Sequence, residues 1–586
     1  MNAKFKNTLN QPLPLPKSFW GWLLAAIGFS FLLSLVIVVI VDPTPRRFDW
    51  PLAGIGTAGG TIIFLVYAFI RWLCCWRNLV RFVFGAACVA TVVGLFYAEE
   101  NWRGRHVWRQ FEQACLAKGI TLDFASVVPP RVPDDQNFAM TPIVYSSYGQ
   151  MLTRDGKMIP WPQQNQNFTN RMSMSIEEYH YDLSAGSEAA GNWQGSRFAQ
   201  LAGWQSYYRS LAAKTNEFPV PAQPGSPAAD VLLALSTYDG VVAELRAAAR
   251  RPESRFPLNY DSESPFAILL PHLASLKSCA RLLSLRSVAE LQNNQPQPAL
   301  DDACLGFQLA DKLRTEPWEV SQLVRLAMAQ ITLQPVWEGL AQHRWSEEQL
   351  AALDAELAPI DFFVAYRLGL HADLGGQTKQ MDLIRQHPLR IQDIDGEQGN
   401  TPWPGPGPSA AILLPTGWLY QAEYRSANLL VDHFLPAADG SSHTFSPAII
   451  RRGEDLLRAD AQSPWFFTWY EQVMLPDLTQ TTEKFAHGQA TVDLARVAVA
   501  LERYRLAHGD YPETLDVLAP KFIATVPHDV IGGQPLKYHR QTDGRFVLYS
   551  VGWNETDDGG KVVLGGGTTP AVDLEKGDWV WEYPAE

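Results

Sequence analysis

The sequence predicts a mainly α-helical protein with three N-terminal transmembrane helices, a large irregular α-helical domain of helix hairpins, and a small α+β domain at the C-terminus. Three observations predict this fold: three long uncharged runs near the N-terminus, helical spacing of apolar residues from residue 191 onward, and strand-like segments near the C-terminus. The chain has 586 residues, 47% of them hydrophobic and 19% charged. It is therefore too long for one core and too apolar for a disordered protein.

The first elements predicted are membrane helices. Residues 1–18 form a basic N-terminal tail, and residues 19–98 hold three runs without a charged residue. A helix needs about 20 apolar residues to cross a bilayer, and tryptophans at the ends of the runs are typical of an aromatic belt. The expected partner of this region is thus the lipid bilayer. The three runs are residues 19–41, 52–70 and 82–98.

The distribution of Lys and Arg predicts the orientation. The N-terminal tail and the second loop hold six of these residues, whereas the first loop and the segment after the third run hold five. Positive residues accumulate on the cytoplasmic side, so the count favours, by one charge, an integral membrane protein with a large extracytoplasmic C-terminal part. The runs contain no carboxylate or lysine, which argues against a transporter.

The net charge of −13 is unevenly spread. Residues 1–110 hold eleven Lys and Arg and four Asp and Glu, a balance of +7, which leaves −20 for the remainder. Proteins that bind nucleic acid need a basic surface, so this acidic part argues against a nucleic-acid partner.

The middle of the chain is predicted to be irregular first and helical afterwards. Residues 99–190 form an irregular connecting region with a Pro-rich stretch, and residues 191–398 form the α-helical domain. Ser264 is the expected N-cap of one helix, and the capping box of Ser346 and Gln349 opens another. Short links favour antiparallel neighbours. The other helices are expected at residues 228–251, 265–292, 298–314, 318–343 and 361–386.

A Pro- and Gly-rich linker is expected at residues 399–411, and further helices at residues 412–484, namely 417–434 and 447–461. Cys279 and Cys304 allow two interpretations. They either pair across a helix hairpin or are buried free cysteines.

One cluster suggests an enzyme. Asp261, Glu263 and His272 lie near the expected start of the helix at 265–292 and could line the cleft of a membrane-anchored envelope hydrolase. A capped loop before a helix explains the same residues.

The C-terminal segment, residues 485–586, is predicted to be an α+β domain. An amphipathic helix at 485–508 stops at Gly509. A short helix or turn follows at 515–522, and the turn Thr542-Asp543-Gly544 joins two expected strands, 536–540 and 545–551.

Several motifs follow one another in this segment. They are His508-Gly509-Asp510-Tyr511-Pro512, then Pro527-His528-Asp529, then Ser550-Val551-Gly552-Trp553-Asn554 with Asp557-Asp558-Gly559-Gly560, and finally Asp578-Trp579. In this order the segment, about 490–580, resembles the globular head of the major pseudopilins of type II secretion. The rest of the chain departs from that family, because Leu33 stands where a pseudopilin carries Glu and some 390 residues separate the membrane region, which ends at residue 98, from the head. The resemblance therefore implies a pseudopilin-like head used as a domain rather than a pilus subunit.

The final loop binds calcium in major pseudopilins, so the resemblance implies Asn554, Asp557, Asp558 and Asp578 as calcium ligands. Calcium takes six to eight oxygen ligands, which a flexible Asp/Asn/Gly loop can supply. The alternative is a solvated Asp-Gly-Gly turn between strands. We expect no catalytic or other cofactor-binding residue.

The predicted function is that of a membrane-anchored, non-catalytic protein of a bacterial envelope with a scaffold or interaction role. Its head would link it to protein partners in type II secretion-like machinery. The alternative is the envelope hydrolase described above.

Overall fold

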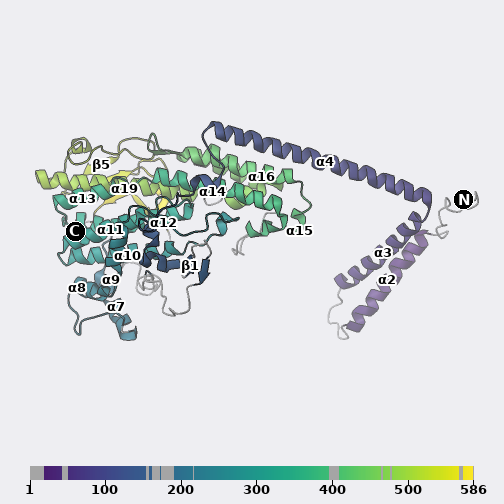
Figure 1. Ribbon diagram of the computed structural model, residues 1–586, viewed down its shortest axis with the longest axis horizontal. Helices are drawn as coiled ribbons and strands as arrows, with labels where there is room; N and C mark the ends of the chain where they lie inside the picture. Colours follow the sequence, from purple (N-terminus) through teal and green to yellow (C-terminus); the bar gives the residue numbers. More distant parts are fainter. Residues whose placement is uncertain are drawn as a thin grey trace, which may run out of the picture. The chain divides into compact units, whose positions relative to one another are not determined.

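The protein was analysed as a computed structural model, in which the chain divides into two compact units, residues 1–103 and 104–586 (Figure 1). Both units are mainly helical, as predicted. Each unit is described by itself. The structure describes residues 19–41, 50–148, 150–152, 158–160, 172, 191–215, 217–394, 408–462, 466–475, 478–565 and 572–584.

The first unit contains α2 (Phe19–Val41), α3 (Trp50–Leu73) and the beginning of α4 (Trp76–Ala117). Helices α2 and α3 pack side by side (Figure 1). The predicted uncharged runs at residues 19–41 and 52–70 lie within these two helices, since a segment without charges or prolines in its interior can close all of its backbone hydrogen bonds as a helix.

Helix α4 is much longer than the run at 82–98 predicted. It has 42 residues and ends at Ala117, so the irregular region begins after residue 117 and not at 99. The helix continues because Trp108, Phe111 and Cys115 recur at helical spacing and form an apolar stripe on one face. This stripe is buried in the second unit. The boundary between the two units falls inside this helix.

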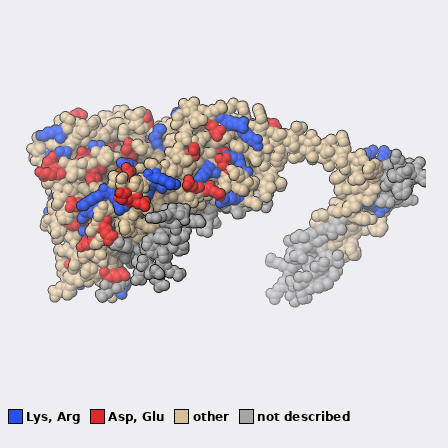
Figure 2. All heavy atoms as spheres, viewed as in Figure 1, with Lys and Arg blue, Asp and Glu red and all other residues tan. Residues whose placement is uncertain are grey.

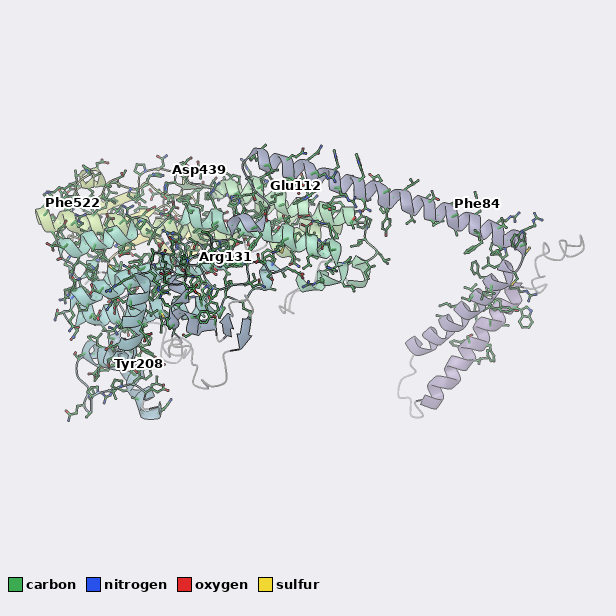
Figure 3. The ribbon with its side chains drawn as sticks, in the orientation of Figure 1. Phe84, Glu112, Arg131, Tyr208, Asp439 and Phe522 are labelled. Atoms are coloured by element: carbon green, nitrogen blue, oxygen red, sulfur yellow. The ribbon has the colours of Figure 1, made fainter. Side chains whose placement is uncertain are left out.

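The apolar part of α4 is exposed along its whole length. All side chains from residue 81 to 96 are exposed, and Phe84, which Figure 3 labels, has 71% of its surface uncovered. In Figure 2 the described atoms of α3 and of the first part of α4 are mostly uncharged, whereas acidic and basic groups are interspersed over the second unit. An exposed apolar surface of this length is typical of a helix that lies in lipid.

The number of candidate spans differs from the prediction. Within the described residues, α4 is the one helix long and apolar enough to cross a membrane, where the sequence predicted three. The described apolar stretches of the other two helices, Gly21–Leu32 and Phe64–Leu73, fall short of the roughly 20 residues that a span needs.

The second unit is built around two long helices, α12 and α19. Helix α12 packs against α10, α11, α14 and α19, and it contributes the fully buried Trp337 to the largest buried cluster. The α-helices that the structure describes in this unit before the predicted linker are α5 (Pro142–Tyr145), α7 (Leu201–Thr215), α8 (Pro227–Leu235), α9 (Asp239–Ala249), α10 (Pro271–Gln292), α11 (Pro296–Asp311), α12 (Glu319–Ala341), α13 (Glu347–Leu357) and α14 (Phe362–Gln386).

Two predicted helices differ in the structure. The Ser264 hydroxyl forms no capping hydrogen bond and donates instead to Gln380 Oε1 at 2.8 Å; the residue precedes one 3₁₀ turn, Pro265–Ala267, and α10 begins only at Pro271. The expected helix at 228–251 is divided into α8 and α9 by a 3₁₀ turn, Ser236–Tyr238. The capping box of α13 is confirmed, since Ser346 and Gln349 each accept from the other's backbone N–H.

The predicted linker at 399–411 lies mostly outside the described residues, and its last part is helical. The helices that follow are α15 (Pro408–Ala411), α16 (Thr416–Leu429), α17 (Pro447–Ala461), α18 (Trp469–Met474) and α19 (Leu478–His508). Both cysteines are free in the structure, Cys279 buried and Cys304 half-buried.

The C-terminal segment belongs to the core of the second unit. Helix α19 begins seven residues before the predicted boundary at 485, is buried over most of its length, and packs against α12, α13 and α14. The predicted boundary therefore falls inside a central helix.

The predicted hairpin is confirmed. Strands β5 (Lys537–Arg540) and β6 (Phe546–Ser550) pair antiparallel around the expected turn, and β9 (Trp579–Glu582) adds a third strand on the other side of β6. Every residue of β6 is buried, because the sheet packs on α19. The remaining strand pairs are β1 (Gln150–Leu152) with β2 (Met158–Pro160), β3 (Ala438–Asp439) with β4 (Thr444–Phe445), and β7 (Val562–Leu564) with β8 (Val572–Gly577).

Candidate functional site

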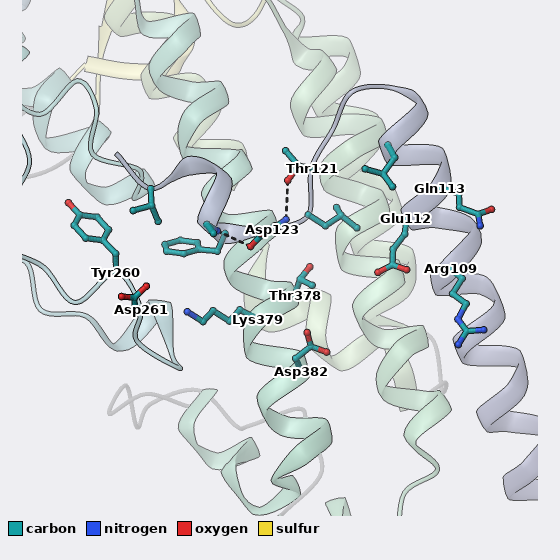
Figure 4. A pocket seen from close by; sticks show the side chains of 16 residues that line it. Arg109, Glu112, Gln113, Thr121, Asp123, Tyr260, Asp261, Thr378, Lys379 and Asp382 are labelled. Carbon is teal, nitrogen blue, oxygen red and sulfur yellow. Dashed lines mark hydrogen bonds between the residues drawn. The ribbon is translucent and has the colours of Figure 1, made fainter. Parts of the chain in front are cut away.

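A cavity of about 700 Å³ opens in the second unit and is the candidate site. Its walls are the C-terminal end of α4, the segment 121–128, the loop at 260–261, and one face of α14 (Figure 4). Its volume lies within the range of small-molecule sites in proteins, about 300–1,000 Å³.

The segment 121–128 is positioned by local interactions. Asp123 accepts the backbone N–H of Ala125 at 2.9 Å and so caps a short 3₁₀ helix, Phe124–Val127. This helix lies directly on α14 at Gly375, where a Cβ atom would come within 2.6 Å of the backbone nitrogen of Phe124. A glycine is thus required for the close approach that forms the cavity wall.

The cavity carries charges of both signs. Its cations are Arg109 and Lys379, which have no ion-pair partner within the described part of the chain. The Lys379 ammonium lies 5.9 Å from the centroid of the Phe124 ring, and Figure 4 shows its side chain extending toward Asp261. Glu112, which accepts from Trp108 Nε1 at 3.0 Å, adds a carboxylate on the opposite wall. The arrangement suits a polar ligand that has both positive and negative groups.

The residues of the hydrolase hypothesis are not brought together. Asp261 lines the cavity, whereas Glu263 forms an exposed ion pair with Arg390 at 2.7 Å. His272 is fully buried, and its Nε2 atom lies 2.8 Å from Glu316 Oε2.

His272 belongs instead to a buried polar network. Its Nδ1 atom lies 2.9 Å from the Tyr148 hydroxyl, and its ring stacks on Phe256 with centroids 4.0 Å apart. Ser321 donates to the other oxygen of Glu316 at 2.9 Å. Burial raises the pKa of Tyr148 well above its ordinary value. The sequence did not predict this network, because Glu316 and Tyr148 are 44 and 124 residues from His272 along the chain. No local pattern joins residues at such separations.

The four predicted calcium ligands lie in and beside one loop, but protein donors occupy their oxygens. The buried Asp578 carboxylate accepts backbone N–H groups from Asp558 at 3.2 Å, Gly560 at 2.7 Å and Lys561 at 3.2 Å. These three backbone N–H groups carry partial positive charges that favour the ionised Asp578 carboxylate, as a bound cation would.

The remaining ligands are likewise satisfied. Asn554 donates from Nδ2 to Asp558 Oδ2 at 2.9 Å, while Asp557 accepts from the Tyr549 hydroxyl at 2.9 Å and pairs with Lys537 at 3.1 Å. Among the described residues no group of three His, Cys, Asp or Glu side chains is arranged to hold a metal ion. The calcium site stays a prediction.

A second network, around the buried Glu502, joins the C-terminal segment to the turn that follows α12, and the sequence did not predict it. The Glu502 carboxylate accepts from Arg505 at 2.7 and 2.9 Å and from the Tyr511 hydroxyl at 2.8 Å, and it lies 2.9 Å from His343 Nδ1. Burial alone would raise the pKa of Glu502, but the hydrogen bonds from Arg505 and His343 outweigh it and lower this pKa to about 2.

No protein-family model, no curated protein and no solved structure matches this chain.

Proposed function

We propose that this chain is a membrane-anchored, non-catalytic envelope protein whose second unit binds other molecules. One observation carries the proposal: α4 combines an exposed apolar stretch, long enough to cross a bilayer, with four residues that wall the cavity. Those residues are Arg109, Glu112, Gln113 and Leu116. A helix that was only part of a soluble core would bury its apolar stretch.

The proposal includes the membrane arrangement expected from the sequence. Helices α2 and α3 would join α4 as transmembrane helices, and the second unit would lie outside the cytoplasm. The test is alkaline carbonate extraction of membranes from expressing cells, followed by protease treatment of intact spheroplasts. The chain should stay in the membrane pellet, and the protease should cleave the second unit. Release of the chain into the supernatant would contradict the membrane anchor. Full protection of the second unit from protease would contradict the proposed orientation.

The cavity would serve as the ligand site of the anchored unit. Lys379 and Arg109 would pair with the anionic part of a ligand, and Asp261 and Glu112 with its cationic part. This division of charges supports binding, because oppositely charged side chains on facing walls can each pair with one end of a polar ligand.

The secretion link is proposed through the C-terminal segment. A long helix followed by the sheet β5-β6-β9 supports it, since this is the order of elements that the resemblance to a pseudopilin head implies. Deleting residues 485–586 would not test the link, because it would remove α19 from the core.

A photo-crosslinking residue at the exposed Thr556 of the final loop tests the link without disturbing the core. The expected result is a crosslink to a component of the secretion machinery, with no such product from a crosslinker at Leu269, which is 84% exposed. The same products from both positions, or none from Thr556, would contradict the link.

A further inference from the structure

A second cavity, of about 530 Å³, lies between α12, α19 and β8, apart from the one in Figure 4. Helix α12 contributes Leu326 and Gln330, and Val572 and Leu574 of β8 add further apolar surface. The polar groups come from α19 and β8. They include Glu483, His487, Asp573 and Glu575.

The unusual member of this cavity is Glu483. Its side chain is buried, with 5% of the residue exposed, and within the described residues it has neither a hydrogen bond nor an ion pair. A buried carboxylate without a partner is costly, so most buried carboxylates in proteins are paired. Burial, together with the nearby carboxylates of Glu575, Glu454 and Asp573, raises the pKa of Glu483 to about 7.

The described side chains around Glu483 supply no buried cation that could pair with it. His487 supplies no positive charge, because burial lowers its pKa to about 4. Its ring nitrogens lie 3.1 Å from Gln330 Nε2 and 3.3 Å from Gln194 Nε2, which holds the ring in place. Lys484 is the one cationic side chain among the described lining residues, and it is exposed.

We propose that this cavity binds an alkylammonium group, with Glu483 as its ion-pair partner and Leu326, Val572 and Leu574 in contact with its aliphatic stem. The group could be the head of a small organic amine or the side chain of a lysine, which share this chemistry. The cavity volume fits a ligand of this size. A protonated amine donates up to three hydrogen bonds, and a hydrogen bond between an ammonium and a carboxylate is about twice as strong as one between neutral groups.

The proposal is tested by isothermal titration calorimetry on the full chain in detergent micelles. The probes are N-acetyl-lysine amide, 1,5-diaminopentane and the uncharged N-acetyl-norleucine amide. Both cations should bind at pH 8, and the norleucine compound should not. Binding of the lysine compound alone would assign the ligand to a peptide side chain, and binding of the diamine alone would assign it to free amines.

Two variants identify the carboxylate. Glu483→Gln should weaken binding at least about tenfold, because it removes the ion pair and keeps the shape. Glu454→Gln makes the same change of charge nearby on α17, where Glu454 pairs with Arg458 and does not line the cavity. It should change the affinity less than about threefold. Equal losses of affinity in the two variants would show that binding responds to the general negative charge of this region and not to Glu483. That result would overturn the proposal.

The pH dependence gives an independent readout. The groups that face Glu483 are Lys484 and His487 on α19, Asp573 and Glu575 on β8, and Glu454 on α17. Binding should be stronger at pH 8 than at pH 6, because Glu483 ionises between these values, and the difference should vanish in Glu483→Gln.

A further variant keeps the test decisive if Glu483→Gln does not fold. Gln480→Lys places a tethered ammonium at the exposed rim of the cavity, where it should compete with the probes and abolish their binding. Unchanged affinity in Gln480→Lys, or binding of the norleucine compound as tight as that of the cations, would overturn the proposal.

Discussion

At the scale of single residues, Glu502 shows how the C-terminal segment is attached to the rest of the second unit. We expect Glu502→Gln to lower the free energy of unfolding at pH 7 by about 1.5–3 kcal/mol, since the amide cannot accept hydrogen bonds from Arg505 and Tyr511 with both of its terminal atoms. Denaturant unfolding of the purified chain measures this difference.

The pH dependence of the Glu502 effect follows from its lowered pKa of about 2. A carboxyl group whose pKa is lower in the folded state stabilises the fold above its unfolded pKa of about 4.5 and loses this contribution as the pH falls toward 2. The gap in stability between the wild type and Glu502→Gln should therefore be constant above about pH 5 and narrow between pH 4.5 and pH 2. A gap that does not change with pH would contradict the assignment.

Asp578 provides a second test at the residue scale. Its carboxylate holds the backbone N–H groups of Asp558, Gly560 and Lys561, so Asp578→Asn should destabilise the loop by about 1–3 kcal/mol. Faster hydrogen exchange at Gly560 in the variant is the direct readout.

The same pair of proteins decides the calcium prediction. Melting with millimolar calcium is compared with melting in chelator. A calcium-dependent rise in the melting midpoint of the wild type, absent from Asp578→Asn, would support the ligand set of Asn554, Asp557, Asp558 and Asp578. No rise in the wild type would reject it.

At the scale of elements, the contact of α14 with the segment 121–128 shapes the candidate site. Gly375→Ala should push the segment away from α14 and lower stability by about 1–3 kcal/mol, because the new methyl group meets the backbone of Phe124, which cannot move aside as a side chain can. Thermal melting and limited proteolysis within 121–128 measure the effect. The matched control is Gly240→Ala in α9, where no atom lies within 4 Å of the added Cβ and no loss of stability is expected.

The elements also show what the sequence could predict. The capping box at Ser346 and the hairpin turn at residues 542–544 depend on residues within a few positions of one another, and both were predicted correctly. The start of α10 was not, because Ser264 donates to Gln380, 116 residues away, instead of capping a helix.

The candidate site was less predictable than the fold for the same reason. Of the cavity's lining, sequence reasoning singled out only Asp261, because the walls come from α4, the segment 121–128 and α14, which are far apart along the chain. The networks around His272 and Glu502 likewise join residues whose proximity exists only in the folded protein.

At the scale of the whole molecule, buried carboxyl groups should make stability depend on pH. Burial raises the pKa of Glu338 and of Asp493 to about 7 from ordinary values of 4.5 and 3.8. An acid whose pKa is raised on folding stabilises the fold at low pH and loses that contribution as the pH rises through its folded pKa. The melting midpoint should thus be lower at pH 8.5 than at pH 6.

Variants locate the source of this pH dependence. Glu338→Gln and Asp493→Asn should each reduce the difference between the two midpoints, since each replaces a titrating group by a neutral one of the same shape. Glu348→Gln is the control, because hydrogen bonds at this exposed residue lower its pKa and it does not titrate between pH 6 and pH 8.5. A midpoint that rises with pH would contradict the prediction.

The central position of α19 predicts the result of a truncation. A chain that ends at residue 484 should fail to fold as a compact unit, because α12, α13 and α14 would each expose the apolar face that α19 covers. Size-exclusion chromatography and circular dichroism in detergent would show aggregation and a loss of helix beyond the residues removed. A compact remainder with its helices intact would show that the C-terminal segment is a separate domain after all.

The burial of α19 also sets the order of events during synthesis. Helix α12 is complete at Ala341, but its partner ends at His508, 167 residues later. At about 5–20 residues per second, the ribosome needs roughly 8–33 s to make that stretch. During this time the faces of α12 and α14 that α19 covers in the folded protein have no partner from their own chain. If the second unit is exported as it is made, it crosses the membrane before its core can close, so a chaperone on the far side would have to protect these faces until the last hundred residues arrive.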